Sequence, residues 1–110
     1  MRKFNRTQGK KRAFLKTLAH NLIMKEKMET TEARAKEIRP IIERLVTLAK
    51  KQNLAGLRML VSKIPKDSAM KMYYETALRY QDRKGGYLRI LKTSKRRKRD
   101  GAKMSIIEFV

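Results

Sequence analysis

Cysteine is absent from this 110-residue chain, and so is tryptophan. Without thiols the chain forms no disulfide and has no thiol chemistry or thiolate metal site. Its aromatic residues are three phenylalanines and four tyrosines. Such a small set provides no aromatic platform of the kind on which single-strand-binding proteins stack bases.

Long apolar runs are also missing. No stretch of about 18 consecutive apolar residues occurs, and no apolar segment of signal-peptide length follows the basic N-terminus. We therefore expect a soluble, intracellular protein that has no membrane partner.

Acidic residues are scarce: ten stand against thirty Lys and Arg, which gives a formal net charge of +20. Hydrophobic residues nevertheless make up 41% of the chain, too many for a fully disordered polycation. This length suits one domain spanning residues 1–110, with a modest core. We expect a folded body with charge on its outside and a basic tail at residues 1–8.

The positive charge is concentrated at the two ends of the chain. Residues 1–25 carry +8 with no acid, residues 26–78 carry +4, and residues 79–110 carry +8. Ends of one sign repel themselves in the free protein, and a polyanion would relieve that repulsion. Solubility alone does not require two separate basic blocks. A polyanionic partner is therefore favoured over a merely solvated basic surface.

Apolar periodicity predicts two helices in the first half of the chain. In 9–23 the stripe is Phe14, Leu15, Leu18 and Leu22, with basic residues largely around the rest of the helix. In 31–51 a complete stripe of Ile38, Ile41, Ile42, Leu45, Leu48 and Ala49 gives the strongest helix signal in the sequence. Thr30 or Thr31 is expected as its N-cap. Pro40 predicts a kink over 36–40, because an interior proline removes a hydrogen bond.

Two shorter helices are predicted next. Asn53 caps the third, whose apolar residues are Leu57, Leu60, Val61 and Ile64, and Pro65 ends it. Asp67 or Ser68 caps the fourth, which runs to about residue 80 with Met70, Tyr73, Tyr74, Ala77 and Leu78 on its inner face. Core packing accounts for this Met and Tyr stripe better than a cofactor site does.

After Gly85-Gly86 the residue pattern becomes typical of β-strands. Residues 87–93 and 103–110 read as an antiparallel pair, separated by the basic run 95–99 and the turn dipeptide Asp100-Gly101. A weaker strand candidate at 25–30 can complete a three-stranded sheet, since two strands alone are marginal. The fold class is thus α+β: four helices on a small, mainly antiparallel sheet of about three strands, with a basic N-terminal tail and a basic hairpin loop.

Catalytic chemistry finds little support. The one histidine, His20, has no second His or Cys with which to form a metal site, and at most acts as a surface donor. The scattered acids look like intramolecular partners of neighbouring Lys and Arg. Gly85-Gly86 lacks the spacing of a phosphate-binding loop. We expect no enzymatic activity, catalytic residue, metal, cofactor or small-molecule substrate.

Four blocks of sequence resemble the bacterial large-subunit ribosomal protein seventeen family. They are METTEARAKE at 28–37, LVTLAK at 45–50, GGYLRILK at 85–92, and Met104 with IEFV at 107–110, in order along nearly the whole chain. The resemblance implies an α+β fold and binding to 23S ribosomal RNA near the outer end of the nascent-chain exit tunnel. It also implies a cytoplasmic location in the ribosome and contact with neighbouring large-subunit proteins, including number thirty-two. The chain departs from the family in its leader and in the loop after Arg99.

Binding to RNA through phosphate contacts is therefore the expected function, in support of subunit assembly and translation. Tyr87 either stacks on a base or packs within the protein. Without RNA, residues 1–8 and the loop near 94–101 are expected to be disordered. The residues expected to contact rRNA are Arg2, Lys3, Arg6, Lys10, Lys11, Arg12, Lys16, Arg34, Lys36, Arg89, Lys95, Arg96, Arg97, Lys98 and Arg99.

Two other classes of protein fit the basic composition. A DNA-compacting architectural protein would prefer duplex DNA to ribosomal RNA at moderate salt. A protein that acts on anionic membrane surfaces would need an amphipathic helix that stays exposed, and would bind anionic vesicles.

Overall fold

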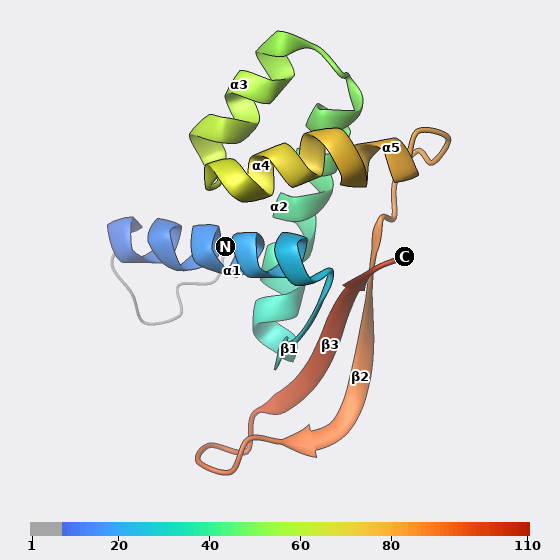
Figure 1. Ribbon diagram of the computed structural model, residues 1–110. Helices are drawn as coiled ribbons and strands as arrows, with labels where there is room; N and C mark the ends of the chain where they lie inside the picture. The colour runs from blue at the N-terminus through green and yellow to red at the C-terminus, as the bar shows by residue number, and fades with distance from the viewer. Residues whose placement is uncertain (1–7) are drawn as a thin grey trace.

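Residues 8–110 are described by a computed structural model of the chain. Its elements follow in the order α1 Gln8–Lys25, β1 Lys27–Thr31, α2 Glu32–Lys50, α3 Leu54–Lys63, α4 Lys66–Lys71, the π-helical turn η1 Met72–Thr76, α5 Ala77–Arg79, β2 Leu88–Arg96 and β3 Lys103–Phe109 (Figure 1). Because α4, η1 and α5 are continuous, residues 8–110 hold four helices and one three-stranded sheet. The predicted α+β class is confirmed.

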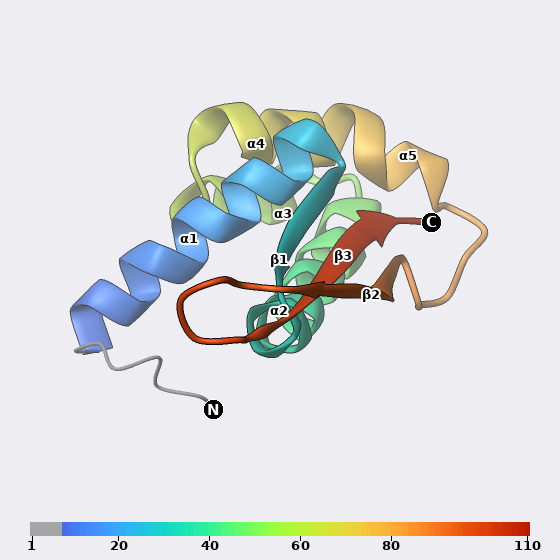
Figure 2. The same ribbon diagram turned by 90° about the horizontal axis from the view of Figure 1, so that it is seen from below.

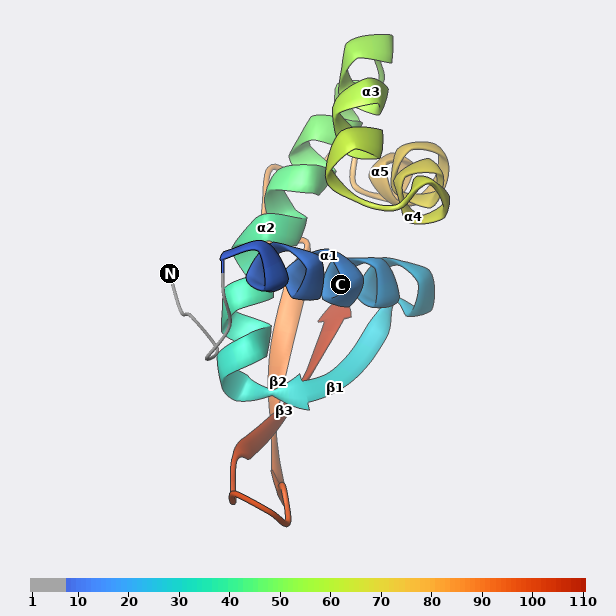
Figure 3. The ribbon, with the colours of Figure 1, turned by 90° about the vertical axis from the view of Figure 1, so that its left-hand side faces the viewer.

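Helix α2 is the centre of the fold. The sheet lies along its first half, α1 crosses it, and α3 and the α4–α5 helix gather at its second half (Figure 3). Ile38, Ile42 and Val46 are fully buried, with Ala35, Leu45 and Ala49 beside them. A stripe this wide contacts helices on one side and strands on the other, so α2 joins both layers.

The N-cap of α2 is one of the two predicted threonines. Thr31 Oγ1 accepts a hydrogen bond from the Arg34 amide at 3.3 Å. Pro40 lies inside the helix, which stays one continuous element, and its exposed position lets water reach the carbonyl left without a donor one turn back. The kink over 36–40 stays a prediction.

Helix α3 begins as the sequence predicts, because the Asn53 side chain accepts a hydrogen bond from the Gly56 amide at 2.7 Å. It ends at Lys63, just before Ile64 and Pro65. Its buried face is narrower than expected. Leu60 and Ile64 are buried, but Val61 is 40% exposed, so the prediction for Val61 is wrong.

Replacing Asn53 by alanine should destabilise the protein by about 1 kcal/mol, because the first turn of α3 then loses a side-chain acceptor. Urea unfolding of the two proteins measures the difference. Leu54→Ala is the matched control, since Leu54 is 60% exposed at the next position. Equal midpoints for Asn53→Ala and the wild type would contradict the assigned cap.

The helix over 66–79 differs from prediction at its start and in its buried face. Neither Asp67 nor Ser68 caps it: the N-cap is Pro65, with no side-chain bond, and the Ser68 hydroxyl instead donates to the Pro65 carbonyl. The buried residues are Ser68, Ala69, Met72, Thr76, Ala77 and Tyr80. Of the predicted inner face only Ala77 is fully buried, while Tyr74 and Leu78 are more than half exposed. Small side chains let this helix approach α1 and α3 closely, which a stripe of large apolar residues does not predict.

The sheet has the order β1-β3-β2, and both pairings are antiparallel. The C-terminal strand is therefore central. Ile107 pairs with Ile90 on one side and with Met28 on the other, and it is fully buried beneath α2. The third strand that the sequence suggested at 25–30 is confirmed as Lys27–Thr31.

Candidate nucleic-acid interface

The β2–β3 hairpin extends away from the helices and carries the basic run at its tip (Figure 1). Strand β2 continues to Arg96, so Lys95 and Arg96 lie on a strand and the turn proper comprises residues 97–102. The turn is closed by the Gly101 amide on the Arg97 carbonyl at 2.8 Å and by the Arg97 amide on the Ala102 carbonyl at 3.0 Å. Gly101 adopts a φ of +64°, which suits glycine.

An ion pair fixes the shape of the turn. Arg97 Nε and Nη2 donate to the two carboxylate oxygens of Asp100 at 3.1 and 2.5 Å, and Oδ1 also accepts from the Ala102 amide at 3.1 Å. Charge-assisted hydrogen bonds favour the ionised carboxylate, so they lower the pKa of Asp100 to about 2. They also raise the pKa of Arg97. Arg97 therefore shapes the tip, while Lys98 and Arg99 are exposed on it.

The pH dependence of this turn follows from the direction of the Asp100 shift. Because the folded pKa is depressed, the stabilisation is complete above the ordinary value of 3.8 and is lost as the pH falls toward about 2. Carbon NMR of the Asp100 carboxyl should show a midpoint near 2. In Arg97→Gln it should return toward the ordinary value, and an unchanged midpoint would contradict the pairing.

Cations line the two hollows between the hairpin and the start of α2. One hollow contains Lys92, Lys95, Arg96 and Lys103, and the adjoining one contains Lys36 and again Lys103; Glu32 lies in both. Glu32 pairs with Lys36 at 2.9 Å and with Lys92 at 3.8 Å, and these contacts lower its pKa. One carboxylate thus faces five cations, and the excess leaves these hollows strongly positive.

Helix α1 supplies the second basic surface. Lys10, Arg12 and Lys16 are exposed along it, as expected. Lys11 is only 4% exposed and lies on the inward face of α1, one turn before the buried Leu15. The prediction that Lys11 belongs to the basic face is therefore wrong. Helical spacing explains this, since residues four apart share a face. The first turns of α1 and the hairpin tip both point toward the left-hand side of the molecule in Figures 1 and 2.

Of the other predicted residues, three make contacts within the protein and three lie outside the described chain. Arg34 places its guanidinium 4.9 Å from the centre of the Phe14 ring and so ties α2 to α1. Arg89 pairs across the strands with Glu108, Nε to Oε1, at 2.6 Å. Lys95 approaches Glu29 at 3.9 Å. Arg2, Lys3 and Arg6 lie outside the described residues.

Tyr87 packs within the protein and is not placed to stack on a base. It is 1% exposed, its ring centre lies 5.4 Å from that of Tyr80, and its hydroxyl accepts from Lys50 Nζ at 3.0 Å. Burial alone would raise the pKa of Tyr87, but the contacts with Lys50 and Thr47 and the charge of Lys50 together outweigh it, so the pKa is lowered. Lys50 therefore has a structural role, because it holds the Tyr87 hydroxyl in place.

Two cations of the hairpin hollows escaped sequence reasoning. Lys92 and Lys103 stand outside the run 95–99, yet both line the same hollow. The strand register explains why Lys103 belongs to this cluster: it lies on β3 directly opposite Arg96 of β2. A two-residue turn at Asp100-Gly101 would pair Lys103 with Lys98, so the sequence could have pointed to Lys103 but not to its observed pairing with Arg96.

Metal binding and membrane insertion find no support in the described part of the chain. Among residues 8–110 there is no cluster of three or more His, Cys, Asp or Glu that could hold a metal ion. Over the same residues, no helix has the length and apolar character needed to cross a bilayer.

The fold is a small α+β domain, and its cations gather on a projecting hairpin and on one helix. This combination is typical of a ribosomal protein. Comparison with known proteins makes the class specific. A family model described as ribosomal protein L17 matches residues 14–110. The chain therefore belongs to the ribosomal protein L17 family.

Curated relatives match over nearly their full lengths. The chain is 44% identical over 108 residues to a protein of Hydrogenobaculum sp. strain Y04AAS1, covering 97% of this chain and 92% of the relative. It is 42% identical over 114 residues to one from Exiguobacterium sp. strain AT1b, covering 98% and 97%. It is 44% identical over 121 residues to one from Staphylococcus carnosus, covering 99% and 98%. All three are named large ribosomal subunit protein bL17.

The family consists of structural ribosomal proteins, which confirms the expectation that the chain is not an enzyme. Membership also confirms the expected location in the ribosome, in the cytoplasm.

Proposed function

We propose that this structural constituent of the bacterial large ribosomal subunit binds 23S rRNA through the β2–β3 hairpin and the exposed face of α1, near the nascent-chain exit tunnel. The observation that supports it most is the hairpin, which holds Lys95, Lys98 and Arg99 exposed beyond the helical body beside the hollows at the start of α2. Phosphates that meet such a surface release counterions, whatever the local sequence.

The contacts expected at this surface are mostly with phosphate. Lys10, Arg12 and Lys16 hold one RNA segment, and Lys36, Lys95, Arg96, Lys98 and Arg99 hold another. Arginine contributes forked planar donors that suit phosphate or stack on a base. By holding separate rRNA segments in register, the protein supports subunit assembly. Neighbouring large-subunit proteins, including number thirty-two, are the further partners.

Competition binding tests the proposal. Labelled 23S rRNA should retain the protein at moderate salt against an excess of duplex DNA, and anionic vesicles should not take it up. The protein should also sediment with large subunits after a salt wash that strips loosely bound proteins. A preference for duplex DNA would instead indicate an architectural DNA-binding protein.

The sequence predicts a disordered loop near 94–101 without RNA, whereas the structure continues β2 to Arg96 and closes the turn; hydrogen exchange tests whether rRNA stabilises this tip further. The amides of Arg97, Gly101 and Ala102 donate within the turn, so they report on its order. Because the Arg97–Asp100 pair already closes the turn, we expect the tip amides of the free protein to open only locally, with exchange faster than at buried strand positions, and to slow further when rRNA phosphates neutralise the charge of the tip. The Phe109 amide, which donates to the Glu26 carbonyl at 3.1 Å, is the internal control. Unchanged exchange at the tip when rRNA is added would refute the expectation; the tail at 1–7 lies outside the described residues.

A further inference from the structure

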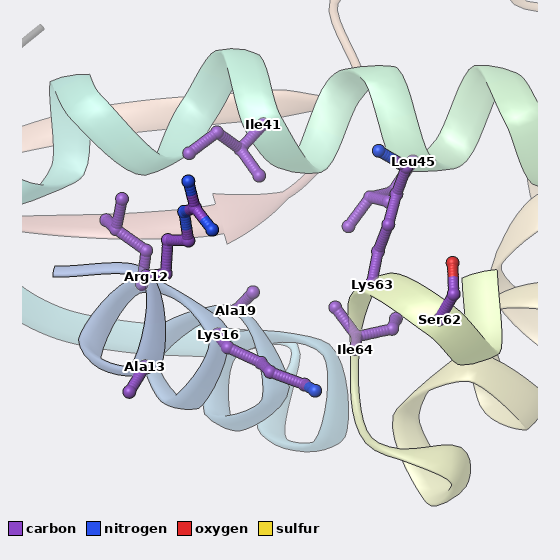
Figure 4. A pocket seen from close by; sticks show the side chains of 10 residues that line it. Arg12, Ala13, Lys16, Ala19, Ile41, Leu45, Ser62, Lys63 and Ile64 are labelled. Atoms are coloured by element: carbon purple, nitrogen blue, oxygen red, sulfur yellow. The ribbon is translucent and has the colours of Figure 1, made fainter. Parts of the chain in front are cut away.

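A groove runs along the side of α2 that faces α1 and α3. Two hollows form it, of ≈ 480 and ≈ 510 Å³, and they share Ile41, Leu45 and Lys63 (Figure 4). The first lies where α1, α2 and the end of α3 meet, and the second continues along α2 as far as Lys51. Each hollow has the volume of a small-molecule site.

The floor of the groove is apolar and fixed. Leu15, Ala19, Leu45 and Ile64 are at most 6% exposed, since they also belong to the core that joins the three helices. The two hydroxyls on its walls are already used: Ser62 donates to the Met59 carbonyl and Thr47 to the Glu43 carbonyl. The floor therefore offers apolar contact but few free polar groups that could recognise the hydrogen-bonding pattern of a ligand.

Cations surround this floor on all three helices. Arg12 and Lys16 belong to α1, Arg44 to α2 and Lys63 to α3, and Lys51 directly follows α2. Within residues 8–110 no Asp or Glu lines either hollow. In Figure 4 the Arg12 side chain reaches from α1 toward Ile41, so its guanidinium lies across one end of the first hollow. A planar guanidinium can stack on an aromatic ring as well as pair with an anion.

The occupant that fits is a flat body with apolar faces, linked to an anion on each side. A nucleotide within an RNA strand has this form, with its base between two phosphates. A second copy of the chain does not fit, because each copy carries +20. Ribosomal RNA contains many unpaired nucleotides whose bases can leave the stack, and those are the ones that protein surfaces receive.

We propose that the groove receives one unpaired rRNA nucleotide, with its base on the floor against Ile41 and Leu45 and its flanking phosphates on Arg12 or Lys16 and on Lys63. The inference rests on the proposed rRNA binding. It adds a site at which the protein distinguishes a bulged strand from a continuous duplex, without selecting the identity of the base.

Two synthetic RNA hairpins test the site. One carries a single bulged 2-aminopurine, and the other is fully paired and otherwise identical. The full-length protein should bind the bulged hairpin about tenfold more tightly than the paired one, which is the effect of one base contact. The fluorescence of the bulged 2-aminopurine should change when the protein is added.

Two variants with matched controls locate the effect. Ile41→Asn should remove most of the preference for the bulge and leave the affinity for the paired hairpin unchanged, whereas Val61→Asn on α3 should keep the preference. Lys63→Gln should reduce the preference more than Lys66→Gln does, and both replaced lysines are exposed, so folding is kept. Circular dichroism of each variant checks its fold.

The outcomes separate this inference from the proposed function. Equal affinity for the two hairpins overturns the nucleotide site and leaves rRNA binding intact. Failure to bind either hairpin or rRNA overturns both. If an acidic amphipathic peptide displaces the bulged hairpin and binds more tightly, the groove is a protein-docking site and the nucleotide inference is wrong.

Discussion

Replacing Lys95, Lys98 and Arg99 together by glutamine should weaken binding to rRNA by about 10- to 100-fold at moderate salt. All three are exposed at the hairpin, and the Arg97–Asp100 pair that shapes the turn is left in place. Each substitution removes one cation that would displace counterions from the RNA, so the slope of log affinity against log salt should fall by about three. Fluorescence anisotropy over a salt series measures both quantities.

The matched control removes three exposed cations from elsewhere. Arg58, Lys66 and Lys84 lie on α3, at the start of α4 and before Gly85-Gly86. Their replacement by glutamine lowers the net charge by the same amount. If both triple variants bound rRNA equally weakly, net charge and not the hairpin would govern binding, and the proposed interface would be wrong.

The hairpin itself was predictable from the sequence because its signals are local. Asp100-Gly101 lies between two β-rich segments, and Gly101 adopts the left-handed angle that such a turn requires. The strand order β1-β3-β2 is not a local property. It depends on β1, more than 70 residues before β3, pairing with it from Lys27↔Glu108 to Thr31↔Met104.

The misplaced residues share a physical cause. Lys11 and the helix over 66–79 were assigned by residue type, with large apolar side chains inside and charge outside. The structure buries Ser68 and Ala69 where helices approach closely, and it places Lys11 on the inward face of α1. Close helix packing depends on which neighbour is present, and a single helix does not reveal its neighbours.

The candidate site was predictable in its composition but not in its shape. The two basic blocks are visible in the sequence, and the structure shows Arg12, Lys16, Lys95, Lys98 and Arg99 exposed. Neither the hollows beside the hairpin nor the apolar groove could be predicted. Each forms only when segments far apart in sequence meet, as Glu32 meets Lys92 and Ile41 meets Lys63.

The frame that positions both surfaces depends on α2, and Ile42 tests it. Ile42 is fully buried in the helix that contacts the sheet and the other helices. Ile42→Ala should lower the free energy of unfolding by about 3 kcal/mol, because the surroundings cannot close the cavity completely. For a domain of this size the melting temperature should fall by about 15 °C.

Leu78→Ala provides the comparison, since Leu78 is an apolar helical residue that is 53% exposed. Its loss should change the free energy of unfolding by less than about 1 kcal/mol. Calorimetry of the free protein measures both variants.

A total stability of about 5–15 kcal/mol leaves Ile42→Ala folded at low temperature, so its RNA affinity there can still be compared with the wild type. If Ile42→Ala and Leu78→Ala were equally stable, α2 would not be the element on which the hairpin and α1 are held. Loss of stability with retained affinity at low temperature would show that the core contributes to binding only by positioning the cations.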